Sequence, residues 1–207
     1  MKNILPQQPL AQPVKRVAMP IEHQREKLLN MIAYFSKHTK KCGRTKLLKL
    51  LYHADFRHFK ETGRPITGLR YYAWKWGPVP TELWRELKDE RYRGEDLRKS
   101  FGILIDERND RFELKLRKPF KFIPVIFTPR ELKIIEDVAT IFRDADGDTM
   151  VDSTHLPDDP WQRTLSQWGL GREIPYDFSF DSSEESLPKE EHLERLRDDR
   201  AIRETFE

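Results

Sequence analysis

The fold of this chain is decided by one leucine-rich stretch, Lys46-Leu47-Leu48-Lys49-Leu50-Leu51-Tyr52-His53-Ala54-Asp55. The stretch lies inside a predicted helix that begins at Arg44 and ends near Thr62, before Gly63 and Pro65. Its apolar residues form two stripes at helical spacing on adjacent faces. The stripes consist of Leu47, Leu50, Leu51 and Ala54 and of Leu48, Tyr52 and Phe59. Because apolar contacts are needed on two sides, we expect this helix to be the central one of the core.

Further helices are predicted on both sides of the leucine-rich stretch. Apolar residues at helical spacing predict one helix from Glu22 to Thr39, and another is expected to take Pro80 as its first residue. Thr128-Pro129-Arg130-Glu131 has the N-cap threonine, the first-turn proline and the glutamate of a capping box. Asp159-Pro160-Trp161-Gln162 has the same kind of start. The chain is therefore predicted to be mainly helical.

Two segments favour extended structure. Residues 67–77 are rich in tyrosine and tryptophan and predict a short strand, which Gly77-Pro78-Val79-Pro80 would follow as a rigid turn. Residues 101–116 alternate apolar and polar side chains around Arg108-Asn109-Asp110, which predicts a hairpin. The predicted fold class is mainly α (α+β), a compact helical domain with a small antiparallel β element.

Composition narrows the class of protein. Among the 207 residues, no apolar run approaches the roughly 18 residues that a membrane span needs, so we expect no membrane partner. The N-terminus has no apolar segment typical of a secretory signal. Cys42 is the single cysteine, which excludes an internal disulfide framework and a cysteine-cluster zinc site. These features predict a cytoplasmic protein.

Charge and proline content divide the chain into three parts. Residues 1–21 are rich in proline and predict a flexible arm. Residues 22–170 are predicted to form the folded domain, and residues 171–207 an acidic extension. Residues 181–207 carry ten acidic and five basic side chains, a net charge of −5, so the rest carries +8 of the total of +3. A basic body with an acidic tail suggests that the tail covers the body or serves a partner.

Several short motifs follow one another in a distinctive order. The leucine-rich helix precedes Gly63-Arg64-Pro65, then Tyr72-Ala73-Trp74-Lys75-Trp76-Gly77-Pro78-Val79-Pro80, Leu83-Trp84-Arg85-Glu86-Leu87, Ser153-Thr154-His155 and Pro160-Trp161. This order resembles the Panacea family, also called SocA-like or GepA-like, of bacterial and phage antitoxin domains, over about residues 24–168. The positions that match the family's motifs are Lys49, Leu50, Tyr52, Ala54, Ala73, Gly77, Pro78, Val79, His155 and Trp161.

The resemblance implies an antitoxin of a toxin–antitoxin system. Members of the family neutralise unrelated toxins, commonly encoded beside them, mostly by direct binding. In the SocA branch the protein is instead a proteolytic adaptor that delivers its toxin to a AAA+ protease. The resemblance also implies a mainly helical fold with a small β element. The long acidic end and the proline-rich start depart from the family's pattern.

The aromatic segment before Gly77 is the candidate toxin-binding site. In a strand, Tyr72, Trp74 and Trp76 share one face, while Tyr71, Ala73 and Lys75 share the other. One alternative is that these rings pack in the core against the leucine-rich helix. The other is that they form an exposed anchor, since tryptophan and tyrosine dominate interface hot spots. The candidate residues are Tyr71, Tyr72, Trp74, Trp76 and Pro78.

Two basic groups offer a third function, a nucleic-acid-binding regulator. The groups are Lys37, Lys40, Lys41, Arg44, Lys46 and Lys49, and Lys115, Arg117, Lys118 and Lys121. They are interpreted as a solvated face, or as a surface for an acidic toxin, for the chain's own tail or for nucleic acid. No helix-turn-helix placement of these lysines is recognisable, so nucleic acid is not the expected partner.

No catalytic or metal-binding constellation is recognisable in the sequence. His53 and His58 are five residues apart, which does not stack two ligands on one helix face. His155 is interpreted as a histidine that ties the Trp161 helix to its neighbour. Asp144 to Asp148 resembles the start of a calcium loop but lacks its glycine and glutamate at the required positions. The sequence therefore predicts a non-enzymatic protein without metal or cofactor.

Overall fold

The computed structural model describes residues 20–106, 111–118 and 120–180. Within these ranges the chain is mainly helical and carries two small antiparallel sheets of two strands each, which confirms the predicted fold class. The α-helices are α1 (Pro20–His38), α2 (Arg44–Thr62), α3 (Thr81–Lys88), α4 (Glu95–Ser100), α5 (Pro129–Ile141), α6 (Gly147–Asp152) and α7 (Pro160–Trp168). The strands are β1 (Tyr72–Trp74), β2 (Gly77–Val79), β3 (Phe101–Asp106) and β4 (Arg111–Leu116).

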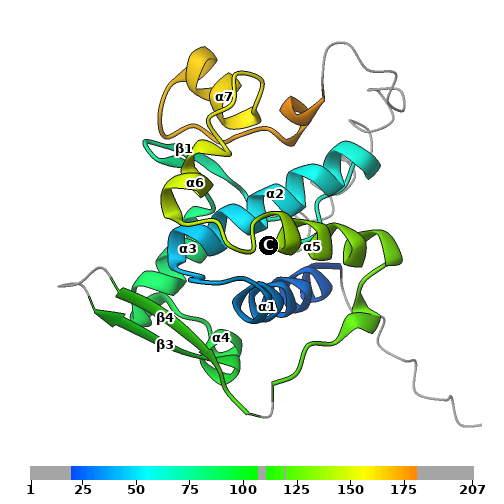
Figure 1. Cartoon of the computed structure of the whole chain (residues 1–207), viewed down its shortest axis with the longest axis vertical. Helices are drawn as coiled ribbons and strands as arrows, with labels where there is room; N and C mark the ends of the chain where they lie inside the picture. The colour runs from blue at the N-terminus through cyan, green and yellow to red at the C-terminus, as the bar shows by residue number, and fades with distance from the viewer. Residues whose placement is uncertain (1–19, 107–110, 119, 181–207) are drawn as a thin grey trace, which may run out of the picture.

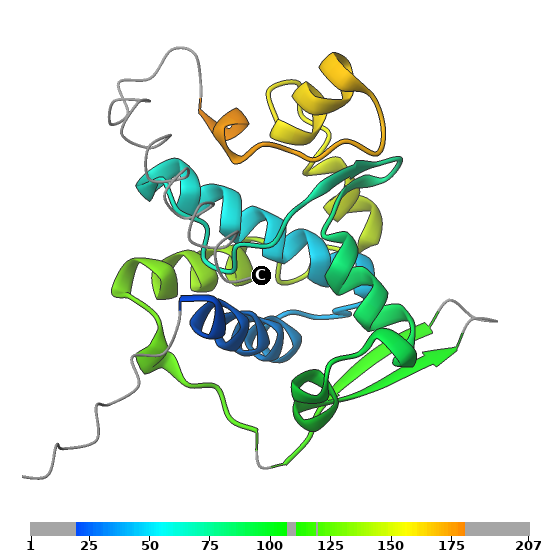
Figure 2. The same ribbon diagram turned by 180° about the vertical axis from the view of Figure 1, so that it is seen from behind.

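Helix α2 is the central element, as its two apolar stripes predict. In Figures 1 and 2 it runs between α1 and α5 on one side and β1–β2 with α7 on the other. Leu47, Leu50, Leu51, Ala54 and Phe59 are fully buried. Burying each of these leucine and phenylalanine side chains contributes about 1.5–3 kcal/mol to folding, so α2 is the main apolar support of the fold.

Two clusters of buried apolar residues lie on the two sides of α2. The larger one joins α2 to α1, α3, α4, α5 and β3. The smaller one joins α2 to the aromatic segment and to the end of the described chain, and it consists of Tyr52, Phe56, Tyr71, Ala73, Trp161 and Ile174. The second cluster places the segment around residue 72 directly on the central helix.

Ion pairs fasten α1 to elements far along the chain. Arg25 donates to Glu86 on α3 and to Asp96 on α4, each with an N–O distance of 2.6 Å. Lys27 donates to Glu131 on α5 at 2.7 Å. Because these groups are partly buried, the pairs are screened less than surface pairs and help to fix the positions of α3 and α5 against α1.

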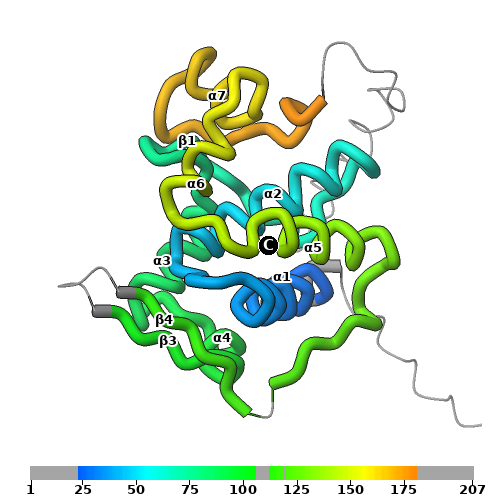
Figure 3. The backbone as a smooth tube through the Cα atoms, in the orientation of Figure 1, coloured from blue at the N-terminus to red at the C-terminus, as the bar shows by residue number. Residues whose placement is uncertain are grey.

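Strands β3 and β4 form the predicted second hairpin. Phe101 pairs with Leu116 and Asp106 with Arg111 in an antiparallel register. The predicted turn, Arg108-Asn109-Asp110, lies outside the described residues. Figure 3 shows this hairpin at one corner of the molecule, from where the chain passes below α1 to reach α5.

Helix starts were predicted well at two places and less well at others. Thr128 accepts from the Glu131 N–H, and the Glu131 carboxylate accepts from the Thr128 N–H, which is the predicted capping box of α5. Asp159 caps α7 by accepting from the Trp161 N–H. Pro80 is the N-cap of α3 rather than its first residue. Helices α4 and α6 were not predicted, because each has only six residues and too little periodicity.

The two ends of the folded body differ from the predicted boundaries. Helix α1 begins at Pro20, so the last two residues of the predicted arm are helical. Residues 171–180 pack on the body instead of belonging to an extension: the Ile174 N–H donates to the Tyr71 carbonyl, and Phe180 is buried against Phe59. Residues 1–19 and 181–207 lie outside the described residues. Across the described part, no helix has the length and apolar character needed to cross a bilayer.

Candidate functional site

The aromatic segment and the Gly-Pro-Val motif together form one short hairpin. Tyr72 pairs with Val79 and Trp74 with Gly77, and the connection between the strands is the two-residue turn Lys75–Trp76. The prediction of a rigid turn at Gly77-Pro78-Val79 is therefore wrong, since these residues are strand β2. Pro78 is compatible with a strand here because this sheet has only two strands, so its missing N–H lies on an edge.

The inner face of this hairpin is part of the core. Tyr71 and Ala73 are fully buried. The Tyr71 hydroxyl donates to Asp55 on α2 at 2.8 Å, and the backbone and hydroxyl of Thr67 donate to the same carboxylate. Burial raises the pKa of Asp55 to about 6, against the effect of these hydrogen bonds. Asp55 thus links the residues just before β1 to the central helix α2.

The outer face of the hairpin is open to solvent. Tyr72 and Trp74 are half-buried, and Trp76 in the turn is 65% exposed. We call Tyr72, Trp74 and Trp76 the hairpin face. The alternation predicted for a strand holds up to Trp74. Of the five predicted toxin-binding residues, Tyr71 and Pro78 are buried and lie inside the body, so the accessible candidates are the three aromatic residues of the hairpin face.

Lys49 supports the hairpin from below. Its side chain is 2% exposed, and its Nζ has no hydrogen-bond partner among the described residues. A Cβ added to Gly77 would collide with this Nζ and lie 2.8 Å from the Thr154 hydroxyl. Gly77 also has a φ of 102°, which side-chain-bearing residues rarely adopt. Only glycine therefore fits where β2 crosses Lys49.

The charge state of Lys49 is set by its surroundings. Burial lowers its pKa to about 7, and the carboxylate of Asp159 opposes this change. Burial also lowers the pKa of neighbouring His53 to about 4, with the positive charge of Lys49 acting in the same direction. A buried amine without a partner disfavours the ammonium form. Burying Lys49 beneath the hairpin therefore lowers the free energy of unfolding wherever the amine is protonated in the unfolded chain.

Helix α7 holds the hairpin from the other side. The indole N–H of Trp161 donates to the Trp74 carbonyl at 3.0 Å. The start of α7 is tied to α2, because the Tyr52 hydroxyl donates to Asp159 at 2.7 Å. Burial raises the pKa of Asp159 to about 6. His155 packs edge-on against the Trp161 ring, as the sequence interpretation expected of it.

The family-motif positions gather in this support. Leu50, Tyr52 and Ala54 are the buried face of α2, and Ala73, Gly77, Pro78 and Val79 are the hairpin strands. Lys49 lies beneath Gly77, and Trp161 with His155 braces the hairpin from α7. These positions therefore fix the conformation of the hairpin, and its exposed residues project from a rigid base.

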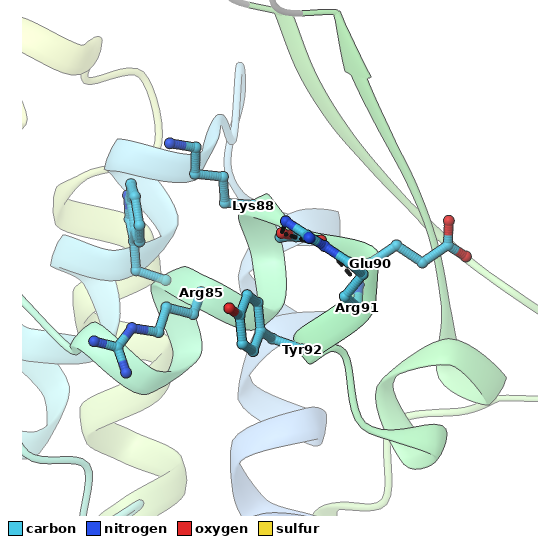
Figure 4. A pocket seen from close by; sticks show the side chains of 7 residues that line it. Arg85, Lys88, Glu90, Arg91 and Tyr92 are labelled. Atoms are coloured by element: carbon cyan, nitrogen blue, oxygen red, sulfur yellow. Dashed lines mark hydrogen bonds and ion pairs between the residues drawn. The ribbon is translucent and has the colours of Figure 1, made fainter.

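The hairpin face continues into a cavity beside α3. Trp74 meets Trp84 of α3 in an edge-to-face contact, with ring centroids 5.0 Å apart. Trp84 in turn is part of the wall of a cavity of about 810 Å³, which we call the α3 cavity. Its walls are Trp84, Arg85, Lys88, Asp89, Glu90, Arg91 and Tyr92 (Figure 4). The aromatic surface thus extends from Trp76 to Tyr92.

Cations surround these rings. Lys88 and Arg44 lie over the Trp84 ring at 4.7 and 5.9 Å from its centroid, and Lys75 lies over Trp76 at 4.8 Å. Among the described residues, no carboxylate forms an ion pair with Arg44, Lys75, Arg85 or Lys88. The surface is therefore both aromatic and positively charged, a composition that suits an anionic partner.

The first of the two predicted basic groups lies only partly on the surface. Lys46 and Lys49 are buried, which corrects their assignment to a solvated or docking surface. The Lys46 ammonium donates to the carbonyls of Lys40, Arg143 and Ala145. Lys115, Lys118 and Lys121 are exposed, and Lys115 pairs with Glu113. Of the first group, Arg44 is the member that reaches the aromatic surface.

The histidine, serine and cysteine side chains that could take part in catalysis are not arranged for it among the described residues. His53 pairs with Ser153 at 2.8 Å, but the Ser153 hydroxyl donates to the Met150 carbonyl, so its proton is not directed at the histidine. Burial raises the pKa of the Cys42 thiol, the opposite of what activation needs. Within the described ranges, no three histidine, cysteine or acidic side chains are grouped as metal ligands would be.

Sequence reasoning missed the α3 cavity. Trp84 was not among the candidate binding residues, but it is half-buried and lines the cavity together with Arg85 and Lys88. The available signal was the placement of two cations one and four residues after a tryptophan on a short helix. This pattern indicates a binding surface only once the tertiary structure is known, because Trp74 and Tyr92 come close to Trp84 through packing of distant residues.

The chain was compared with known proteins. The family model described as "Antitoxin SocA-like, Panacea domain" matches residues 47–162. This range is more than half of the chain and includes most of α2, the β1–β2 hairpin, α3 with its cavity and the start of α7. No curated protein and no solved structure matches the chain.

Proposed function

The chain belongs to the SocA-like Panacea antitoxin domain family, and on that premise we propose that it neutralises a cognate toxin by direct protein–protein binding in the cytoplasm. The toxin would be encoded beside it. Neutralisation would proceed by occlusion: the protein covers a working surface of the toxin and performs no catalytic step. The single observation that carries the proposed binding surface is Trp76, which is 65% exposed at the tip of a hairpin whose base is packed and hydrogen bonded.

Rigidity is the reason why this tip is suited to binding. An exposed tryptophan on a mobile loop loses conformational entropy when it binds, which weakens the complex. Here the backbone of the hairpin is held by Trp161 through the Trp74 carbonyl and by Arg172 through the Ala73 N–H. A backbone that is held before binding lowers this cost, and tryptophan is enriched among interface hot spots.

Co-expression with the neighbouring open reading frame tests the proposal. The neighbour's product is expected to arrest growth, and this protein is expected to restore it and to co-purify with the product in a stable complex. Restored growth with loss of the neighbour's product would favour the adaptor mechanism with a AAA+ protease instead. Absence of growth arrest would contradict an adjacent toxin as the partner.

A further inference from the structure

We propose that the α3 cavity binds an acidic segment of the toxin that carries a large apolar side chain. This inference rests on the proposed function and deepens it, because it names the chemistry of the partner's contact. The apolar side chain would lie between Trp84 and Tyr92. The acidic side chains would pair with Arg85 and Lys88 at the rim, with Arg44 and Lys75 beyond them.

The cavity has the size and lining that such a side chain needs. Its volume of about 810 Å³ falls in the range of roughly 300–1,000 Å³ that is typical of ligand pockets. Tyr92 is 62% exposed although it is a large aromatic residue. Covering two aromatic rings with an apolar partner side chain removes apolar surface from water, which is the main favourable contribution to association.

The charge of the cavity is more positive than its composition suggests. Arg91 donates to Asp89 through several N–H groups and lowers the pKa of that carboxyl group, so Asp89 is already paired. In Figure 4 the Glu90 carboxylate points away from Arg85, Lys88 and Tyr92. Arg85 and Lys88 are exposed and have no carboxylate partner in the described structure. Two cations therefore remain available for a partner.

The cavity continues the hairpin face rather than forming a separate site. The contact between Trp74 and Trp84 joins them, and the cations over these rings lie along the same path. A segment that contacts Trp76 can thus continue along α3 to Tyr92. The two regions together would form one interface with an aromatic centre and a basic rim.

Other occupants suit this surface less well. The affinity for nucleic acid comes largely from contacts between cations and phosphates, and the cavity with its rim offers the four cations named above, a small set for that purpose. In a symmetric pair of two copies the same cations would face each other, which is unfavourable. The acidic residues 181–207 of this chain also have the right charge; they follow Phe180, which lies at Phe59 near the other end of α2 from Arg44, and the test below distinguishes them from the toxin.

The test compares two charge reversals in the full chain. The double variant Arg85→Glu, Lys88→Glu reverses the charge at the rim of the α3 cavity. Arg130→Glu with Lys133→Glu makes the same change on α5, where an arginine and a lysine are also exposed and three residues apart. Calorimetric titration with the purified toxin measures the affinity, and thermal melts check that both variants fold. The cavity variant is expected to bind about tenfold or more weakly, and the α5 variant like the wild type.

A second variant tests the aromatic wall of the cavity, and a synthetic peptide tests the proposed chemistry of the bound segment. Tyr92→Ala is expected to weaken toxin binding by about tenfold, because it removes one wall of the cavity. A labelled glutamate peptide with one central phenylalanine is expected to bind the wild type in fluorescence polarisation and to lose binding in the cavity variant. A lysine peptide of equal length is expected not to bind.

Several outcomes would overturn the inference. Unchanged toxin affinity in both the cavity variant and Tyr92→Ala would do so while leaving neutralisation by the wild type, and hence the proposed function, intact. The inference also fails if single-stranded oligothymidylate binds the cavity and the acidic peptide does not. It fails as well if the cavity variant abolishes a dimer of the wild type, or if it shifts the amide signals of residues 181–207 in the free protein, because the occupant would then be a second copy or the tail.

Discussion

The two hairpins of this protein differ in how they are held. The β1–β2 hairpin has three residues per strand, yet Trp161 and residues 171–174 hold it in place through hydrogen bonds. The β3–β4 hairpin has six residues per strand, but it projects at a corner, and Leu104 is 58% exposed on it. An isolated two-stranded hairpin is marginally stable in water. The comparison indicates that tertiary anchoring, not strand length, fixes the conformation of the shorter hairpin.

The largest effect is expected from Gly77→Ala. The new Cβ would collide with Lys49 in a backbone conformation with positive φ, so the free energy of unfolding should fall by about 3 kcal/mol or more. Urea denaturation measures this change. Gly102→Ala in β3 is the matched control, since its Cβ would meet no atom closer than 3.7 Å. A loss of under about 1 kcal/mol for Gly77→Ala would show that the hairpin is not clamped.

The next effect is the pH dependence that Lys49 imposes. Its pKa is about 7 in the folded protein and 10.5 as the ordinary value, so between these values the unfolded chain binds more protons. The stability of the wild type should therefore rise with pH from 7 to 9, by at most about 1.4 kcal/mol per pH unit. Lys49→Met lacks this slope.

Chemical denaturation of both proteins between pH 7 and 9 checks this expectation. Asp159 and His53, which face Lys49, titrate below this range, at about 6 and 4. The difference in stability between Lys49→Met and the wild type should therefore shrink as the pH rises. Parallel curves for the two proteins would mean that Lys49 is not an unpaired buried amine.

A smaller effect is expected from Trp161→Phe. The substitution keeps an aromatic ring but removes the hydrogen bond to the Trp74 carbonyl, which should cost about 1–3 kcal/mol. Trp168→Phe, at an exposed position on the same helix, should cost under about 0.5 kcal/mol. Equal losses in the two variants would indicate that α7 does not brace the hairpin.

The smallest effect on stability, with a large effect on binding, is expected from Trp76→Ser. Trp76 is exposed, so the free energy of unfolding should change by less than about 0.5 kcal/mol. Toxin affinity should fall at least about tenfold, because an aromatic anchor is lost. Leu104→Ser on β3 is the control and should leave affinity unchanged. A loss of affinity in both variants alike would place the toxin on β3–β4 as well.

The helices that support the hairpin could be predicted from the sequence better than the surface proposed to bind the toxin. Local patterns located α2 at Arg44–Thr62 and the capping box at Thr128, because helical periodicity and capping depend on neighbouring residues. The strand at Gly77–Val79 was missed because its pairing with residues 72–74 overrides the turn preference of Gly-Pro. Such pairing is not encoded in a local pattern.

Contacts between distant residues explain the remaining differences. Lys46 was predicted on the surface, but it is buried, and the carbonyls of Arg143 and Ala145, almost a hundred residues away, accept hydrogen bonds from its ammonium group. The α3 cavity depends on Trp74 meeting Trp84 and on Tyr92 turning back beside α3. No spacing rule predicts these approaches, because they follow from how the helices pack.

Hydrogen–deuterium exchange of the complex with the neighbour-encoded toxin shows directly whether the toxin contacts the hairpin face and the α3 cavity. Toxin binding is expected to slow amide exchange in residues 72–79 and 84–92 and to leave residues 101–106 and 111–116 unchanged. Slower exchange confined to the β3–β4 hairpin, with residues 72–92 unaffected, would contradict it.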